Sequence, residues 1–445
     1  MKNELNTNRI QTMKKLTFLL LIAGNLIAQQ NRLTLEESVE IGLKNSKLIK
    51  ISESKVLSTD AKVNEFTSQM LPKVSFGAGF TYLNLSNPTE LTIGSVPIKV
   101  VNPFGSYGFN LSIQQPIFTG FRLSSSINAA KFNHLATSVE HLKTINNKAL
   151  NIHSAFWNLF KAEKSVELVN ENFSSLKNHL KQTKEFLDNG LVTVNDYLKF
   201  KVLLSNMELE LIDAENRMDI ARALFNRALG FNLSEKTSIE INLNLTNPLS
   251  MEYDELLTEA FMNREELNII DYRIKAGEEQ ITATYSSRWP KLYASGTFFL
   301  SNINAETFSI KDQRLQLWFV GLYMNWNFWD WGYTSSKSDQ AKQNVIQSKE
   351  ALEILKEQIE LEVFSSYLIL QSELEKIEIS KLAVESAEEN YRITEDKYQY
   401  QLATSNDLID AETELLNAKT KLSFAQADYQ LAKVKLDLSV GRKVY

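Results

Sequence analysis

Apolar and polar positions alternate in four stretches of the chain that contain no charged residue. Apolar side chains there are separated by small or polar ones, as Phe76 and Phe80 are, and this period of two is typical of β-strands. Each stretch is too short for a membrane helix of about 20 residues but long enough for a membrane strand of about 9 to 11. Strands are predicted at residues 73–86, 104–117, 291–302 and 315–329.

A second pattern repeats every seven residues in two other segments. From Tyr197 to Phe225 and from Leu408 to Leu436 every seventh residue is apolar, and a second series rich in alanine stands three positions further on. A sustained heptad predicts supercoiled helix pairs, and alanine lets their backbones approach closely. Almost no glycine or proline interrupts these regions, so long helices are predicted at 122–189, 194–230, 333–400 and 405–440.

The chain also repeats itself. Residues 190–230 align with 401–441 without a gap, so that LVTVNDYL in the first copy is aligned with LATSNDLI in the second. We therefore expect a first repeat at 29–232, a linker at 233–250 and a second repeat at 251–445, each with a short helix, two strands and two long helices. The predicted fold class is mainly α with transmembrane β.

The N-terminus has the composition of a secretory signal peptide, predicted at residues 1–28 with a possible true start at Met13. Two lysines precede an apolar run, and Ala28 is a small residue at a suitable cleavage point. The run is too short to span a bilayer as a helix, which favours a signal peptide over a membrane anchor. Its removal takes away four basic residues and one acidic residue, which changes the formal net charge from −6 to −9.

Composition narrows the candidate chemistry. The chain has no Cys, which excludes disulfides, thiolate metal sites and lipidation of an N-terminal Cys. It has no strongly basic patch for nucleic acid, no phosphate-binding glycine loop and no nucleophile elbow. The histidines lack the spacing of a metal pair and are expected at the surface or in grooves; they are His134, His141, His153 and His179. We expect no enzyme activity, cofactor or metal site.

Tryptophan favours membrane strands over soluble hairpins. Five of the six Trp lie between Trp289 and Trp331, at predicted strand ends, as in the aromatic girdle of a transmembrane barrel. Four strands cannot close a barrel, since the smallest membrane barrels have about eight. Open sheet edges are prohibitive in lipid, so several chains must share one barrel. Three chains would supply twelve strands.

Several segments, in this order, resemble the TolC family of outer-membrane efflux proteins. They are LTLEESVEIGLKNS from Leu33, PIFTGF at 116–121, GLVTVNDYL at 190–198, NFWDWG at 327–332 and QLATSNDLIDAET at 401–413. The resemblance runs from about residue 32 to the end. It implies a homotrimer with a twelve-stranded barrel in outer-membrane lipid and a coiled-coil periplasmic helical barrel. It also implies a tip that docks a periplasmic adaptor (membrane fusion) protein and an inner-membrane RND or ABC transporter.

The resemblance further implies a periplasmic gate at the helix–helix turns. Asp407 and Asp410 match a family aspartate pair that would form carboxylate rings suited to cations. The alternative is that Asn406 or Asp407 only caps the outgoing helix. Tyr398 and Asp196 match a closing contact of the family. The remaining gate residues are Asn195 and Lys199, and the tip turns expected to dock the adaptor contain Gly190, Leu191, Val192, Gln401, Leu402 and Ala403.

Two residues depart from the family pattern at this gate. Ala403 stands where relatives have an arginine that closes onto the first turn, and Gln401 replaces a glycine that Gly190 keeps. Lys199 occupies the first-copy position of Asp410, where it would partly neutralise the ring. The closed state is therefore expected to have fewer polar links than in relatives.

These patterns are compatible with two functions. The first is a passive, gated exit duct of a tripartite efflux pump or type I secretion system, located in the outer membrane with a periplasmic extension. The alternative is a structural or adhesive coiled-coil protein of the envelope without transport. The exported substrate and the transporter class do not follow from the sequence.

Overall fold

A computed structural model of the chain describes residues 32–82, 90–99, 106–241, 252–303 and 313–445. The chain divides into two compact units, which are described separately. The hairpin unit comprises Met1–Ile51, Leu142–Arg264 and Glu357–Tyr445, and the sheet unit comprises Ser52–His141 and Glu265–Lys356. The predicted signal peptide lies outside the described residues.

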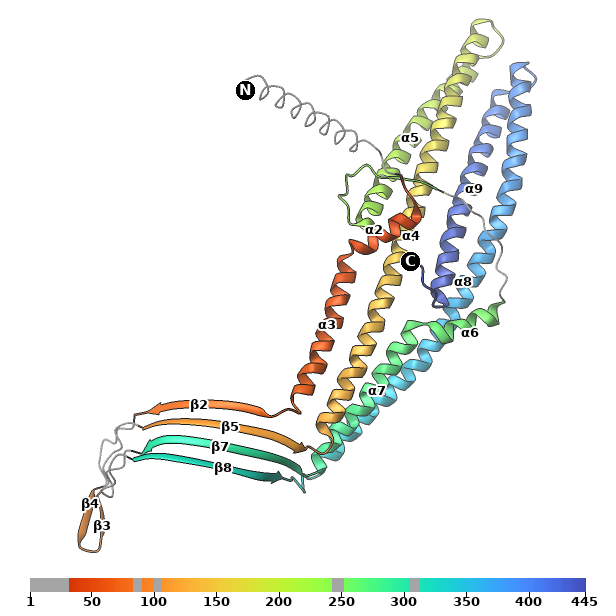
Figure 1. The fold of residues 1–445 in the computed structure, drawn as a ribbon. Coiled ribbons are helices and arrows are strands. Elements are labelled where there is room, and N and C mark those ends of the chain that lie inside the picture. The colour runs from red at the N-terminus through yellow and green to blue at the C-terminus, as the bar shows by residue number, and fades with distance from the viewer. Residues whose placement is uncertain (1–31, 83–89, 100–105, 242–251, 304–312) are drawn as a thin grey trace, which may run out of the picture. The chain divides into compact units, whose positions relative to one another are not determined.

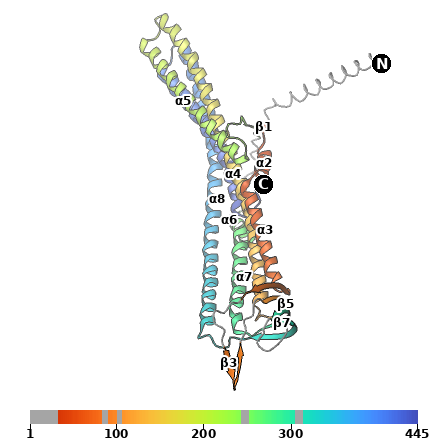
Figure 2. The ribbon, with the colours of Figure 1, turned by 90° about the vertical axis from the view of Figure 1, so that its left-hand side faces the viewer.

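Four long helices dominate the hairpin unit. They are α4 (Arg122–Asp188), α5 (Val194–Leu229), α8 (Tyr333–Gln399) and α9 (Ser405–Ser439), of which α4 and α8 have 67 residues each and continue into the sheet unit. Figures 1 and 2 show α4 running antiparallel to α5, and α8 antiparallel to α9. The lengths follow from the scarcity of Gly and Pro, because only those residues strongly oppose helix propagation.

The heptad positions form the packed sides of α5 and α9. In α9 both series face inward: Leu408 and Tyr429 are 0% and 4% exposed, and Ala411 is 3% exposed. Small residues at the second series bring the backbones close, as coiled-coil packing requires. In α5, Phe200, Ala214 and Phe225 are likewise buried. The heptad positions thus identify which faces of α5 and α9 are buried.

A large core cluster forms where α4 and α5 meet the N-terminal elements. α2 (Leu35–Lys44) follows a short strand β1 (Arg32–Leu33), which pairs in parallel with β6 (Ser238–Ile239). A capping box between Thr34 and Glu37 begins α2. The members of the cluster include Val39, Ile152, Phe156, Trp157, Phe160, Phe225, Leu229 and Ile239. This small parallel pair was not predicted, since two-residue strands leave no periodicity.

Where one short helix per repeat was predicted, the structure has two. α2 is followed by α3 (Lys47–Ser68), and α6 (Tyr253–Asn263) is followed by α7 (Glu265–Tyr285) and a 3₁₀ turn, η1 (Ser286–Arg288). At the second break Arg264 has an extended backbone, with φ −63° and ψ 122°. Its guanidinium donates to the carbonyls of Leu438 and Ser439 and pairs with Glu362. These contacts are long-range, so the sequence gives no local sign of them.

The sheet unit contains one antiparallel sheet in the order β2-β5-β7-β8. Its strands are β2 (Lys73–Thr81), β5 (Ser106–Phe118), β7 (Lys291–Ile303) and β8 (Gln313–Asn325). Leu111 is paired with both Phe76 and Phe298, so equivalent apolar positions share one face. Helices α3 and α4 are joined here by the hydrogen bonds Ser52–His141 and Thr59–His134.

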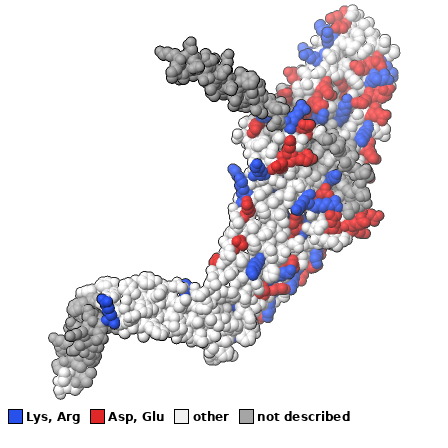
Figure 3. Space-filling view, viewed as in Figure 1, with Lys and Arg blue, Asp and Glu red and all other residues white. Residues whose placement is uncertain are grey.

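The sheet presents apolar side chains outward. Phe76, Val320 and Leu322 are 69%, 76% and 71% exposed, and the strands carry almost no charge on the face seen in Figure 3. Among the described residues, β2 and β8 each pair with one neighbour, which leaves both edges of the sheet open. Open strand edges and exposed apolar faces of this kind are expected to be covered by another surface. In the described part of the chain, none of the helices is long and apolar enough to cross a membrane.

An additional hairpin was not predicted. β3 (Glu90–Ile93) and β4 (Val96–Lys99) pair across a tight turn in which Gly94 has φ +68°. The strands predicted at 73–86 and 104–117 leave this segment without an assigned element, because four-residue strands do not sustain an alternation. The strand predicted at 73–86 ends at Thr81, and its last residues fall outside the described part.

Candidate functional site

The turn from α4 to α5 has a well-defined backbone. Gly190 has φ +73°, and the N–H groups of Gly190 and Leu191 donate to the carbonyls of Leu187 and Phe186, each at 2.9 Å. These two bonds form a Schellman motif, which ends a helix by satisfying its last carbonyls. α5 then begins at Thr193, whose side chain forms a capping box with Asp196.

The turn from α8 to α9 has the same design with one different residue. Gln401 takes the left-handed position with φ +62°, and Leu402 N–H donates to the carbonyl of Lys397 at 2.8 Å. Thr404 and Asp407 form the capping box of α9. Gln401 in place of glycine thus preserves the turn, but it puts a residue with a Cβ at a left-handed position, where glycine is favoured.

Asp407 and Asp196 take part in these caps. Asp407 Oδ2 accepts from the N–H and the hydroxyl of Thr404, at 2.8 and 2.7 Å, and the hydroxyl bond lowers the pKa of Asp407. The hydroxyl of Thr193 likewise lowers the pKa of Asp196. The N-cap residue of α9 is Thr404, and Asp407 caps the same helix as the third residue of its capping box, so the capping alternative holds for Asp407 and not for Asn406. Both carboxylates are ionised at neutral pH.

The other predicted gate residues lie around these caps. Asp410 is exposed one turn beyond Asp407 on α9. The Lys199 amine donates to Asn406 Oδ1 at 3.2 Å and helps to lower the pKa of Asp196. Lys199 therefore connects the two turns, but its hydrogen bond is to the side-chain amide of Asn406 and not to a carboxylate. Asn195 is exposed, as are Leu191 and Leu402, at 50% and 78%.

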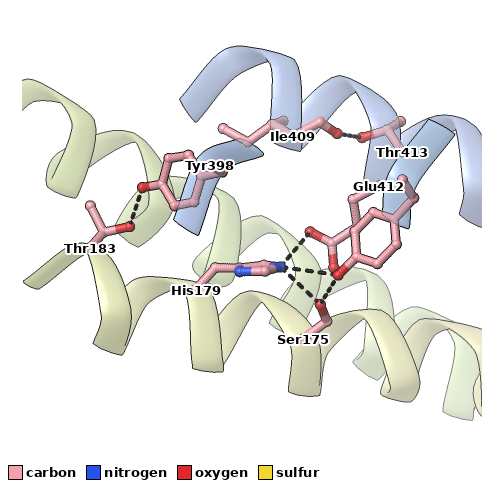
Figure 4. Close-up of polar contacts among 8 residues, drawn as sticks. Ser175, His179, Thr183, Tyr398, Ile409, Glu412 and Thr413 are labelled. Atoms are coloured by element: carbon pink, nitrogen blue, oxygen red, sulfur yellow. Dashed lines mark hydrogen bonds and ion pairs between the residues drawn. The ribbon is translucent and has the colours of Figure 1, made fainter. Parts of the chain in front are cut away.

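Tyr398 is buried rather than bonded to Asp196. Its side chain is 3% exposed, and its hydroxyl shares a 2.9 Å hydrogen bond with Thr183 (Figure 4). The ring packs against Phe186 and Phe200. The predicted Tyr398–Asp196 link is therefore corrected: Tyr398 joins α8 to α4, while the Asp196 carboxylate is bonded to Thr193. Sequence alignment showed which turns correspond, but not which side chain of α4 faces Tyr398.

A buried polar cluster next to this contact was missed by sequence reasoning. His179 and Ser175 on α4 each lie 3.2 Å from the Tyr391 hydroxyl on α8, and His179 Nε2 lies 3.9 Å from Glu412 Oε2 on α9 (Figure 4). His179 and Glu412 are only 4% and 5% exposed. The expectation that His179 is a surface or groove residue is therefore wrong. Glu412 directly follows a heptad alanine, which was the one available signal.

Burial changes the titration of both groups. Burial raises the pKa of Glu412 to about 7 and lowers the pKa of His179. Among the described residues, neither carboxylate oxygen of Glu412 has a hydrogen-bond partner. His153 is also buried, bonded to the carbonyl of Val444, and its pKa is lowered by burial. Within the described part of the chain there is no group of three or more His, Asp or Glu able to hold a metal ion.

Two antiparallel pairs of very long helices, joined to strands with apolar outer faces, define a class of helical channel proteins anchored in a membrane by β-strands. The chain belongs to the outer membrane efflux protein family, whose profile matches residues 40–231 and 256–442. The resemblance inferred from the sequence motifs is thereby confirmed.

Individual relatives agree with this assignment. Outer membrane protein TolC of Escherichia coli (strain K12) is 23% identical over 395 residues, which cover 85% of this chain and 76% of the relative. The solved structure of VceC from Vibrio cholerae has a TM-score of 0.76 at 16% identity and covers 92% of this chain and 97% of that one. The CmeC outer membrane channel of Campylobacter jejuni has a TM-score of 0.78 at 15% identity, with coverages of 92% and 85%. These structures share the fold.

Proposed function

We propose that the chain forms a passive trimeric exit duct, gated at the two helix turns, in a tripartite efflux pump or a type I secretion system. The observation that carries this proposal is the open four-stranded sheet. In lipid every backbone polar group must be paired within the protein, and β2 and β8 leave two edges unpaired among the described residues. Three copies joined edge to edge would close a barrel of twelve strands.

Apolar stripes on the long helices support the same assembly. Ile354, Leu361 and Leu368 on α8 recur every seven residues and are 55%, 67% and 45% exposed. On α5, Val202 and Leu209 are separated by seven residues and are 60% and 63% exposed. An apolar series with a coiled-coil period fits the side of another helix. A homotrimer that assembles its helices into a periplasmic tunnel would cover both stripes.

The duplicated architecture is part of the proposal. The matching caps at Thr193 and Thr404, the equal lengths of α4 and α8, and the two matched family segments support one unit written twice. We assign the turn residues Gly190–Val192 and Gln401–Ala403, of which Gly190, Leu191, Gln401 and Leu402 are exposed, to docking of a periplasmic adaptor that links the duct to an inner-membrane RND or ABC transporter. Export by the signal peptide would deliver the chain to the outer membrane.

The gate consists of Asp196, Asp407, Asp410, Asn195 and Lys199 at the turns, with Tyr398 buried behind them. Both Asp196 and Asp407 have lowered pKa values and would present negative charge at the periplasmic end. Rings of carboxylates favour cations.

The gate is tested by single-channel recording of Asp407→Ala combined with Asp410→Ala. Cation preference and block by divalent cations should fall, because the ring charge is removed. A matched control, Glu414→Ala, changes an exposed carboxylate further along α9 and should leave both properties unchanged. If selectivity is the same in all three proteins, the carboxylate gate is wrong.

A further inference from the structure

The cluster of Ser175, His179, Tyr391 and Glu412 joins the two helix pairs. Two of its members lie on α4, one on α8 and one on α9, and the Ser175, His179 and Tyr391 polar atoms lie 3.2 Å apart from one another. The Tyr398–Thr183 bond lies beside it (Figure 4). Separating the α4–α5 pair from the α8–α9 pair would expose every one of these groups to water.

Glu412 has no cation at hydrogen-bond distance in this cluster, and the nearby Ser175 hydroxyl only partly offsets the effect of burial on its pKa. Its two carboxylate oxygens lack hydrogen-bond partners in the described structure, and its one ion pair there, with His179, spans 3.9 Å. An ionised carboxylate buried in this way is costly. The packed cluster therefore favours either a neutral Glu412 beside a neutral His179, or an ion pair of the two.

The groups around the pair do not supply a compensating charge. α8 contributes Tyr391 and Glu395, and the negative charge of Glu395 disfavours ionisation of Glu412. α4 contributes Ser175 and Gln182, which are neutral. α5 contributes the ring of Phe200, packed against His179. Exactly one proton on the pair thus leaves no net charge in the cluster.

We propose that Glu412 and His179 together carry one proton and act as a buffered latch, which keeps the two helix pairs packed over a range of mildly acidic to neutral pH. Each residue cancels the pH sensitivity that the other would impose. The effect on conduction rests on the proposed channel function, but the latch itself concerns only helix packing.

Proton counting gives the expected pH dependence. When the pairs are apart and solvated, Glu and His titrate near their ordinary pKa values of about 4.3 and 6.5, so one proton remains on the pair between these values. The packed cluster also carries one proton there, because Glu412 keeps its proton up to about pH 7 and the lowered pKa of His179 disfavours a second proton. Equal proton numbers mean that packing is independent of pH in that window.

Outside the window the packing should weaken. Between about pH 6.5, where the separated groups lose their last proton, and about pH 7, where the packed cluster loses its own, packing weakens as the pH rises. Below about pH 4.3 the separated groups take up a second proton that burial opposes on His179. The native chain should therefore show a plateau with a decline on both sides.

Two single substitutions should reveal opposite pH dependences. With Glu412→Gln, only His179 titrates, and its pKa is lowered in the packed state, so packing weakens on the order of tenfold as pH falls from 7.5 to 5.5. With His179→Gln, only Glu412 titrates, and its raised pKa makes packing weaken on the order of tenfold as pH rises from 6 to 8. The double variant should show neither trend.

The absence of cysteine in the chain allows a direct measurement. Spin labels at Lys181→Cys on α4 and Thr413→Cys on α9, both exposed, report the separation of the pairs by electron paramagnetic resonance in the detergent-solubilised assembly, diluted with unlabelled chain. Glu414→Gln, on an exposed face of α9, is the matched control and should behave as native.

Opposite slopes in the two single variants, a plateau in the native chain and no slope in the double variant are expected. Slopes of the same sign, or no slope in either single variant, would overturn the latch. Because the distances do not depend on conduction, a chain that forms no pore but shows the opposite slopes would reject the channel and keep the latch.

Discussion

Gln401 is one of three described residues other than glycine with a left-handed backbone, together with Phe121 and Trp331. It holds φ +62° at the α8–α9 turn, where the α4–α5 turn has Gly190 with φ +73°. For a residue with a Cβ, the left-handed region costs roughly 1–2 kcal/mol. The Schellman bonds and the Thr404 cap offset this cost, since the turn is otherwise the same.

Gln401→Gly should therefore stabilise the second turn by about 1 kcal/mol. Gly190→Ala should destabilise the first by a similar amount, and a Cβ at Gly190 would meet no atom within 4 Å, so the effect isolates the backbone. Thermal unfolding followed by circular dichroism checks both. Equal midpoints for Gln401→Gly and native protein would show that the turn carries no such strain.

Side-chain partners across helices were the part of the site that the sequence could not provide. A heptad states which face of α9 is buried, and it correctly placed Leu408 and Ala411 inside. It does not state which residue of α4 lies opposite, so Glu412 and His179 were not connected, and Tyr398 was assigned to Asp196 instead of Thr183. Of the caps, only the part played by Asp407 was among the alternatives from the sequence; the N-cap residues Thr193 and Thr404 were not predicted.

At the scale of elements, regularity decided what was predictable. Helices α4 and α8 were expected to end at residues 189 and 400 and end at Asp188 and Gln399. Gly190 marks the end of α4, and the alignment of the two repeats places the end of α8 at the equivalent position, since Tyr400 and Gln401 do not oppose a helix. The β3–β4 hairpin and the β1–β6 pair were missed. Their strands are too short for a period of two, and long-range pairing stabilises them.

The apolar stripe on α8 carries a prediction about assembly. Leu361→Glu places a charge where a neighbouring helix should pack, and an unpaired buried charge is strongly destabilising, so the trimer should dissociate. Leu361→Met preserves the apolar surface and should leave the trimer intact. Gel filtration in detergent and heat-resistant migration on gels distinguish them. A trimeric Leu361→Glu protein would place the interface elsewhere.

At the scale of the whole molecule, membership of the outer membrane efflux protein family and the fold of its solved channels agree with each other. The apolar, nearly uncharged strands and the charged long helices (Figure 3) suit two different environments, lipid and water. Among the described residues, the sheet edges are open and the apolar helix stripes are uncovered. In the proposed trimer, two further copies of the chain would pair the sheet edges and cover the helix stripes.

The most direct test of the exit duct is the conductance of the native protein. Purified from outer membranes and added to a planar lipid bilayer, it should run as a heat-resistant trimer and open steady, cation-preferring channels. An envelope protein with a structural or adhesive role would not conduct. A monomer in the periplasmic fraction that forms no pore would contradict the proposal.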